Sequence, residues 1–271
     1  MKKYFLLFFV VFNISTVLGQ ESNLSQKIKD LKVNTKLPND IAEKYFEATK
    51  DYSGEFQPCY LKYKRQCDSL IYIIIDHQIS LGSYSSFYII KNKIVSEYSL
   101  GFSFDSDGAN AKSTSASYRF IHEEIIEIIA TTEVVADSSM YDEHFNMKFG
   151  LSSHNQKMNS HDSYSYLKIN ECRIEELVPS KSVSEKRKFK IASTRLLKKE
   201  DLQTLSYKEL KLMRNEIFAG HGYIFQSADL KKYFSQFDWY KPEKAIVSED
   251  ELSEIERLNI QLIKEFEIAI K

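Results

Sequence analysis

The sequence predicts an α+β protein, in which an antiparallel β-meander, curled into a sheet or an open barrel, precedes a small all-helical C-terminal domain. Apolar and polar residues alternate in short runs between Phe56 and Leu177, and turns bearing Asp, Asn, Ser and Gly separate these runs. The 18 Phe and 17 Tyr, beside 8 Gly and 4 Pro, favour strands with bulky, half-buried faces. From Leu196 onward apolar residues recur at helical spacing.

The length and charge of the chain exclude some classes of protein. The 271 residues suffice for two ordinary domains, each with its own core. The 37 Lys and Arg nearly balance the 38 Asp and Glu, which leaves a formal net charge of -1. A general nucleic-acid binder carries a strong positive charge, so we expect no nucleic acid among the partners.

The first residues have the pattern of an export signal. Lys2 and Lys3 precede an apolar run from Tyr4 to Phe12, and Val17-Leu18-Gly19 offers a cleavage site. The run is shorter than the roughly 20 residues of a membrane span. We expect residues 1–19 to be a signal peptide and the mature chain to be exported, to the periplasm or the extracellular space, and soluble there. A retained anchor is the alternative.

Composition divides the mature chain into four parts. We expect a polar, partly helical segment at 20–55, the β-rich domain at 56–178, a basic linker at 179–195 and the helical domain at 196–271. The linker holds Lys181, Lys186, Arg187, Lys188 and Lys190. Such a run could contact an anionic surface, and we favour the alternative of a solvated linker.

Within the β-rich part, the segments Ile71–Ile75 and Ile125–Ile129 are expected to be buried on both faces. A helix is the alternative for residues 121–130, because the acidic residues of this segment fit both the helical spacing and the alternation of a strand. The expected strands are 60–64, 70–76, 87–90, 94–100, 117–121, 125–135, 164–169 and 173–177.

Three cysteines leave at least one thiol free or intermolecular in an exported chain. Cys59 falls in an alternating stretch and could belong to the core, whereas Cys67 and Cys172 stand in turn-like surroundings. If one disulfide forms, Cys59–Cys67 is the simplest pairing, although a chain of this size can hold a core without it.

The helical part shows clear start and stop signals. Ser206 and Glu209 form a capping box that opens a helix, and Gly220 and Gly222 offer left-handed positions to end it. A second capping box, Ser248 with Glu251, is expected to open a long last helix with a broad apolar stripe.

Several landmarks of this part occur together and in order. Residues 209–225 read ELKLMRNEIFAGHGYIF, and they are followed by Tyr233-Phe234, Trp239-Tyr240-Lys241-Pro242, Leu252 to Glu256, Asn259 and Ile263. On these residues the C-terminal part resembles the YARHG domain of bacterial exported proteins. Phe218 and Gly220 stand where the family has the Tyr and the Arg of its name. The resemblance implies an extracellular or periplasmic module without an assigned reaction. The β-rich part is loosely similar to β-rich exported domains of Bacteroidetes.

We expect most of the motif residues to be structural. Arg214 should pair with a carboxylate of the last helix, with Glu256 as the candidate. Asn215 and Asn259 should satisfy backbone groups near the core. The motif positions considered are Arg214, Asn215, Glu216, His221, Gly222, Trp239, Tyr240 and Asn259.

Three of these residues have a functional alternative. His221 could titrate, but no nucleophile or acid pair accompanies it in the sequence, so a structural histidine is favoured. Trp239 and Tyr240 could stack on a sugar of the cell wall, and anchoring of the small core is the favoured reading.

Other candidate chemistry in the sequence is weak. Asp105 to Gly108 lacks the outer carboxylates of a calcium loop, and His122-Glu123-Glu124 lacks the second histidine of a zinc helix. His144, His154 and His161 are scattered through a polar stretch. We therefore expect no metal and no cofactor.

The leading hypothesis is an exported, non-catalytic binding protein of the cell envelope or extracellular space, with a cell-wall glycan or an envelope protein as partner. The first alternative is an envelope hydrolase, which needs a pocket with convergent polar groups such as Glu123, Glu124 or the stretch from His144 to His161. The second is a structural or assembly protein, which needs a large exposed apolar patch.

Overall fold

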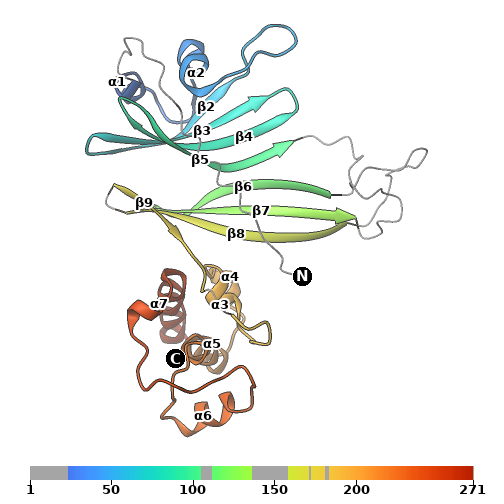
Figure 1. Cartoon of the computed structure of the whole chain (residues 1–271), viewed down its shortest axis with the longest axis vertical. Helices are drawn as coiled ribbons and strands as arrows, with labels where there is room; N and C mark the ends of the chain where they lie inside the picture. The colour runs from blue at the N-terminus through green and yellow to red at the C-terminus, as the bar shows by residue number, and fades with distance from the viewer. Residues whose placement is uncertain (1–23, 105–111, 136–157, 171, 181–182, 271) are drawn as a thin grey trace, which may run out of the picture. The chain divides into compact units, whose positions relative to one another are not determined.

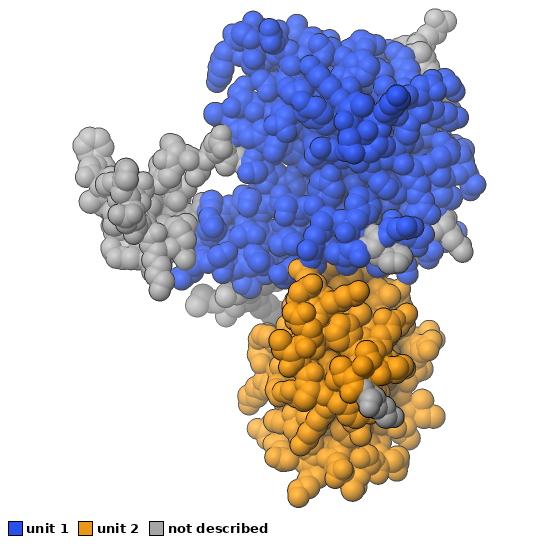
Figure 2. All heavy atoms as spheres, turned by 180° about the vertical axis from the view of Figure 1, so that it is seen from behind, with its two compact units in different colours: residues 1–164, 168–174 blue, residues 165–167, 175–271 orange. Residues whose placement is uncertain are grey.

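A computed structural model describes residues 24–104, 112–135, 158–170, 172–180 and 183–270. The chain divides into two compact units, one of residues 1–164 and 168–174 and one of residues 165–167 and 175–271 (Figure 2). An antiparallel sheet followed by C-terminal helices confirms the predicted α+β class (Figure 1). The signal segment 1–19, the turn 105–108, His144 and His154 lie outside the described residues.

The sheet is antiparallel and open, and the nine strands found in the described part of the chain follow one another in sequence order. The region 125–130 lies on strand β7, so the helix alternative is wrong there. The strands are β1 (Thr35–Lys36), β2 (Cys59–Cys67), β3 (Leu70–Ile79), β4 (Gly82–Lys91), β5 (Lys93–Phe104), β6 (Lys112–His122), β7 (Ile125–Val135), β8 (Met158–Asn170) and β9 (Arg173–Leu177).

The sheet bends between β5 and β6, so that β2–β5 and β6–β9 form two layers (Figure 1). Phe102 and Ala116 are the one β5–β6 pair in register among the described residues. A Cβ at Gly101 would stand 2.8 Å from the carbonyl oxygen of Ala116. A glycine therefore permits the close backbone approach at the bend.

Side chains of β2 and β3 meet those of β6 across the two layers. The rings of Tyr63 and Phe120 lie 4.9 Å apart, and the Tyr118 hydroxyl donates to Asp76 Oδ1 at 3.3 Å. Tyr72 and Ile74 share the face of Asp76, because side chains alternate along a strand. Both are buried, and they contribute to the core on this inner face.

The opposite face of β3 is covered by two short helices, α1 (Leu24–Lys29) and α2 (Asn39–Phe46) (Figure 1). Ile71, Ile73 and Ile75 belong to one buried apolar cluster with side chains of both helices. All residues from Ile71 to Ile75 are at most 1% exposed, which confirms that this segment is buried on both faces.

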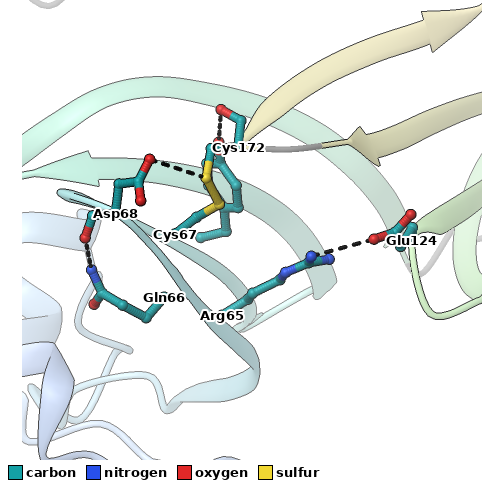
Figure 3. The surroundings of a disulfide bond; sticks show 7 residues. Arg65, Gln66, Cys67, Asp68, Glu124 and Cys172 are labelled. Carbon is teal, nitrogen blue, oxygen red and sulfur yellow. Dashed lines mark hydrogen bonds and ion pairs between the residues drawn. A yellow bond between two sulfur atoms is a disulfide. The ribbon is translucent and has the colours of Figure 1, made fainter.

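One disulfide joins Cys67 to Cys172, with their Cα atoms 5.4 Å apart (Figure 3). The pairing Cys59–Cys67 is wrong because both residues lie on β2, eight positions apart. At roughly 3.3 Å per residue their separation is roughly 26 Å, far beyond the reach of a disulfide. Cys59 is the free cysteine and is buried in the core, as expected from its alternating stretch.

The helical unit contains α3 (Ile191–Thr194), α4 (Lys199–Leu202), α5 (Tyr207–Gly220), α6 (Ala228–Phe234), a 3₁₀ turn (Glu249–Glu251) and α7 (Glu254–Ala269). The capping box of Ser206 and Glu209 opens α5, as predicted. The box of Ser248 and Glu251 is also formed, but it opens only the 3₁₀ turn. The long last helix has its own capping box, made by Ser253 and Glu256.

Part of the expected linker belongs to the helical core. Phe189 is 6% exposed and Ala192 is fully buried, and both pack in one cluster with Leu210, Ile217 and Ile263. The prediction of a solvated linker is wrong for this stretch, because its apolar residues cover the face that α5 and α7 present. Among the described residues, no helix combines the length and the apolar character that crossing a membrane requires.

We predict that the disulfide contributes strongly to the stability of the β-rich unit, because it closes a loop with a sequence separation of 105. Replacing Cys67 and Cys172 together by serine should lower the free energy of unfolding by about 2–4 kcal/mol. Denaturant titration under oxidising conditions measures this change. A reductant should destabilise the wild type and leave the double variant unaffected; equal stability of the two proteins without reductant would contradict the prediction.

Candidate functional site

Asn259 is a motif residue on α7, and its side-chain amide makes hydrogen bonds to the backbone of residues 192–197, which precede α4. Its Oδ1 accepts the N–H of Leu197 at 2.8 Å, and its Nδ2 donates to the carbonyls of Ala192 at 2.9 Å and Arg195 at 2.8 Å. The residue is 1% exposed. Each polar atom of the amide thus satisfies backbone groups.

The motif residue Glu216 forms a buried ion pair with Arg187. Arg187 Nε lies 3.3 Å from Glu216 Oε1, and the two side chains are only 3% and 2% exposed. Arg187 Nη2 also donates to Ser193 Oγ at 3.0 Å, and the Phe189 N–H donates to Glu216 at 2.8 Å. Burial raises the pKa of Glu216, and these contacts offset only part of that effect. Glu216 therefore depends on Arg187 for its charge compensation.

A second buried pair joins the end of α5 to the start of α7. His221 Nε2 lies 2.9 Å from Glu256 Oε2, and the Glu256 side chain is 1% exposed. Burial alone would raise the pKa of Glu256, but hydrogen bonds from His221, Ser193 and the Ser253 N–H hold it below its usual 4.5. Glu256 Oε1 is buried and makes no hydrogen bond of good geometry within the described part of the chain.

Arg214 pairs with Glu267, not with Glu256. Its Nε lies 3.1 Å from each carboxylate oxygen of Glu267. The predicted partner was wrong because α5 and α7 run antiparallel, as the two pairs His221–Glu256 and Arg214–Glu267 show. This direction brings the middle of α5 beside the end of α7.

The glycines at positions 220 and 222 approach other backbone or side-chain groups closely. Gly222 has φ +80°, and a Cβ there would stand 2.8 Å from the Lys241 carbonyl oxygen. A Cβ at Gly220 would stand 2.8 Å from Nη1 of Arg187. The guanidinium of Arg187 therefore occupies the space that a side chain at position 220 would need.

Trp239 and Tyr240 belong to an aromatic cluster around Phe234. Tyr240 is buried and donates its hydroxyl to the Tyr223 carbonyl at 2.7 Å. The Trp239 ring stacks on Phe237 with centroids 5.7 Å apart, and the Arg187 guanidinium lies 5.9 Å from its centroid. The remaining motif amide, Asn215, donates to the Lys211 carbonyl at 2.7 Å on its own helix. Within the described residues, the motif side chains thus contact other side chains or the backbone of the same unit.

The helical unit has a groove of about 530 Å³ between α5 and α6, which no sequence motif indicates. Its polar lining is positive, with three lysines and one aspartate, and Tyr207 and Tyr233 add two aromatic rings. The lining residues are Tyr207, Lys208, Lys211 and Leu212 on α5, and Asp229, Leu230, Lys232, Tyr233 and Gln236 on or just after α6. Spacings of three and four residues place each set on one helix face.

A second hollow, of about 650 Å³, lies in the β-rich unit. Glu123 and Glu124 of the β6–β7 turn line it together with Tyr63, Arg65 and Phe120. Arg65 Nη2 pairs with Glu124 Oε1 at 3.3 Å (Figure 3), and both side chains are about one-third exposed. The hollow therefore brings two predicted carboxylates together, but one of them is already paired with a cation.

Sequence reasoning missed a buried Cys–His–Tyr chain in the first unit. Cys59 Sγ lies 3.4 Å from His77 Nδ1, and His77 Nε2 lies 3.1 Å from the Tyr88 hydroxyl. Burial raises the pKa of Cys59 to about 11 and lowers that of His77 to about 4. Both groups are neutral at pH 7, so Cys59 is not an activated nucleophile.

The described residues contain no cluster of three or more His, Cys, Asp or Glu side chains that could hold a metal ion. Of the three candidate histidines in the polar stretch, His161 lies exposed on β8.

The fold and these contacts define a β-rich protein with a helical C-terminal unit whose motif side chains form an internal polar network. Residues 187–268 match the YARHG domain, which confirms the resemblance drawn from the sequence. The match begins at Arg187, so the buried guanidinium lies within the domain. YARHG domains are typical of exported proteins. No curated protein and no solved structure matches the chain.

We predict that Arg187 and Gly220 are energetically coupled. Gly220→Ala should cost about 1–3 kcal/mol in the wild type, because the methyl group displaces the guanidinium from Glu216 and Ser193. Arg187→Ala should cost about 3–5 kcal/mol, since it leaves Glu216 buried and unpaired. In the Arg187→Ala background, Gly220→Ala should be neutral or stabilising, because alanine favours the helix. Urea titration of the wild type, the two single variants and the double variant measures the free energies of unfolding. If the losses of the two single variants simply add in the double variant, the predicted coupling is contradicted.

We also predict that Glu256 makes stability dependent on pH. Its pKa is lower in the folded state, so its contribution is present above its ordinary pKa of 4.5 and is lost as the pH falls through the folded value. Glu256→Gln should be less stable than the wild type at pH 7, and this difference should shrink below pH 4.5. Denaturant titrations from neutral to acidic pH measure it, with Glu265→Gln on the same helix as the control. A difference that stays constant with pH would refute the assignment.

Proposed function

We propose that the chain is an exported, non-catalytic binding protein of the cell envelope or extracellular space, with the α5–α6 groove as its ligand site. The export pattern of residues 1–19 and the YARHG match support the compartment. The observation that carries the binding site is the uncompensated positive charge of the groove. Lys208, Lys211 and Lys232 line it without an ion-pair partner among the described residues.

The contrast with the motif residues supports this choice. Arg187 and Arg214 each face a carboxylate inside the unit, so their charges are already compensated, and the ring of His221 contacts Glu256. Unpaired charges in a concave surface attract a ligand of opposite sign and fix its orientation. The motif residues maintain the fold, and the groove is left for recognition.

The chemistry on the described residues supports binding over catalysis. Cys59 is a buried, protonated thiol, and Glu124 is occupied by Arg65. A second candidate, an envelope hydrolase, is favoured by one observation, namely that Glu123 and Glu124 line the same hollow. The assembly hypothesis has less support, because the four most exposed apolar side chains of the described residues, Tyr52, Leu81, Ile246 and Ile268, lie in separate segments.

We predict that the folded protein is retained on immobilised peptidoglycan, purified polysaccharides or envelope proteins. Arg214→Ala serves as a motif control: it should lower the melting temperature, because Glu267 loses its partner, and keep the retention below that temperature. Absence of retention on every matrix would overturn the proposed function. Retention lost in Arg214→Ala at unchanged melting temperature would show that the motif itself binds.

A further inference from the structure

We infer that the α5–α6 groove binds an anionic polysaccharide, a sugar chain that carries carboxylate or sulfate groups. The inference rests on the proposed function and adds the chemical class of the ligand. Three features of the groove lead to it: the unpaired lysines, the two tyrosine rings, and the polar side chains Asp229 and Gln236.

The lysines require a ligand with several negative charges. Lys208 and Lys211 lie on α5 and Lys232 lies on α6, so the positive charges flank the groove on both sides. Asp229 is the single carboxylate in the lining. A ligand with negative charges repeated along its length can contact lysines of both helices at once.

The tyrosines offer flat apolar surfaces between these charges. Tyr207 is 41% exposed. Tyr233 is partly buried, and its ring is held by Phe234 and Phe237, whose centroids lie 5.0 and 5.3 Å away. A ring fixed in this way gives a ligand a surface to contact at little cost in side-chain entropy. The apolar face of a pyranose ring suits such a surface.

Asp229 and Gln236 distinguish a sugar chain from an acidic peptide. A carboxylate accepts hydrogen bonds, and a primary amide both donates and accepts them. Sugar hydroxyls can donate to Asp229 and to the amide oxygen of Gln236, whose Nε2 already donates to the Lys232 carbonyl at 3.0 Å. An acidic peptide offers Asp229 only its backbone N–H groups as donors, whereas each sugar unit offers several hydroxyl groups. The lining therefore favours an anionic sugar chain over an acidic peptide.

Binding of polygalacturonate, heparin, dextran and poly-L-glutamate to the full mature chain tests the inference by calorimetric titration. Polygalacturonate supplies carboxylates, heparin supplies sulfates, dextran is uncharged, and poly-L-glutamate is an acidic polypeptide. We expect binding of at least one anionic polysaccharide, weakening steeply from about 0.05 to about 0.5 M salt as the charges are screened. Dextran and poly-L-glutamate should bind at least about tenfold more weakly.

The decisive variant replaces Lys208, Lys211 and Lys232 by alanine. It should bind the anionic polysaccharide about tenfold more weakly or worse, because the charges that attract it are gone. The matched control replaces Lys199, Lys241 and Lys264, which are exposed lysines of the same unit outside the groove. The control should bind like the wild type, and both variants should keep the wild-type melting temperature.

Each contrary outcome has a separate meaning. Equal loss in the control variant would show general charge attraction and overturn the groove as the site. Poly-L-glutamate or dextran bound as tightly as the anionic polysaccharides would overturn the ligand class and leave the binding function standing. If none of the four polymers binds but the protein is retained on another matrix, the inference alone fails; if nothing is retained, the proposed function fails with it.

Discussion

The helical unit depends on one buried interaction, the ion pair between Arg187 and Glu216. A buried carboxylate is tolerated only where a cation and hydrogen-bond donors compensate it, and Arg187 and the Phe189 N–H provide both. The same guanidinium donates to Ser193 and lies over the Trp239 ring. It therefore connects the chain before α3, helix α5 and the aromatic cluster, and it occupies the space beside Gly220.

This arrangement explains the departure of the sequence from the YARHG motif. A side chain at position 220 would enter space held by Arg187, so an arginine there and the present position of Arg187 exclude each other. The unit thus keeps a buried guanidinium next to the motif although the motif position itself is glycine. Two other motif residues also contact carboxylates inside the unit, since Arg214 and His221 each face a glutamate of α7.

Local signals predicted much of the fold, whereas long-range pairings did not follow from them. The alternation of apolar and polar residues, together with turn residues, predicted the strands, and the capping box of Ser206 and Glu209 predicted the start of α5. Both signals depend on residues that are close to one another in the sequence. The partner of Cys67 depends on how the sheet bends, and the partner of Arg214 depends on the direction in which α7 packs. Neither is contained in sequence spacing.

The candidate site, too, depends on contacts between residues that are far apart in the sequence. The motif residues stood out in the sequence, yet their polar atoms are mostly engaged inside the unit. The groove residues Lys208 and Lys232 are ordinary surface lysines in the sequence and become a pair of flanking charges only when α5 and α6 come together.

The most direct test of this division between a structural motif and a binding groove is a nuclear magnetic resonance titration of the labelled protein with an anionic polysaccharide. We expect the changes in chemical shift to concentrate at Tyr207, Lys211, Lys232 and Tyr233, with the signals of Asn259 unchanged. Changes centred on His221, Glu256 and Asn259, with the groove unaffected, would contradict it.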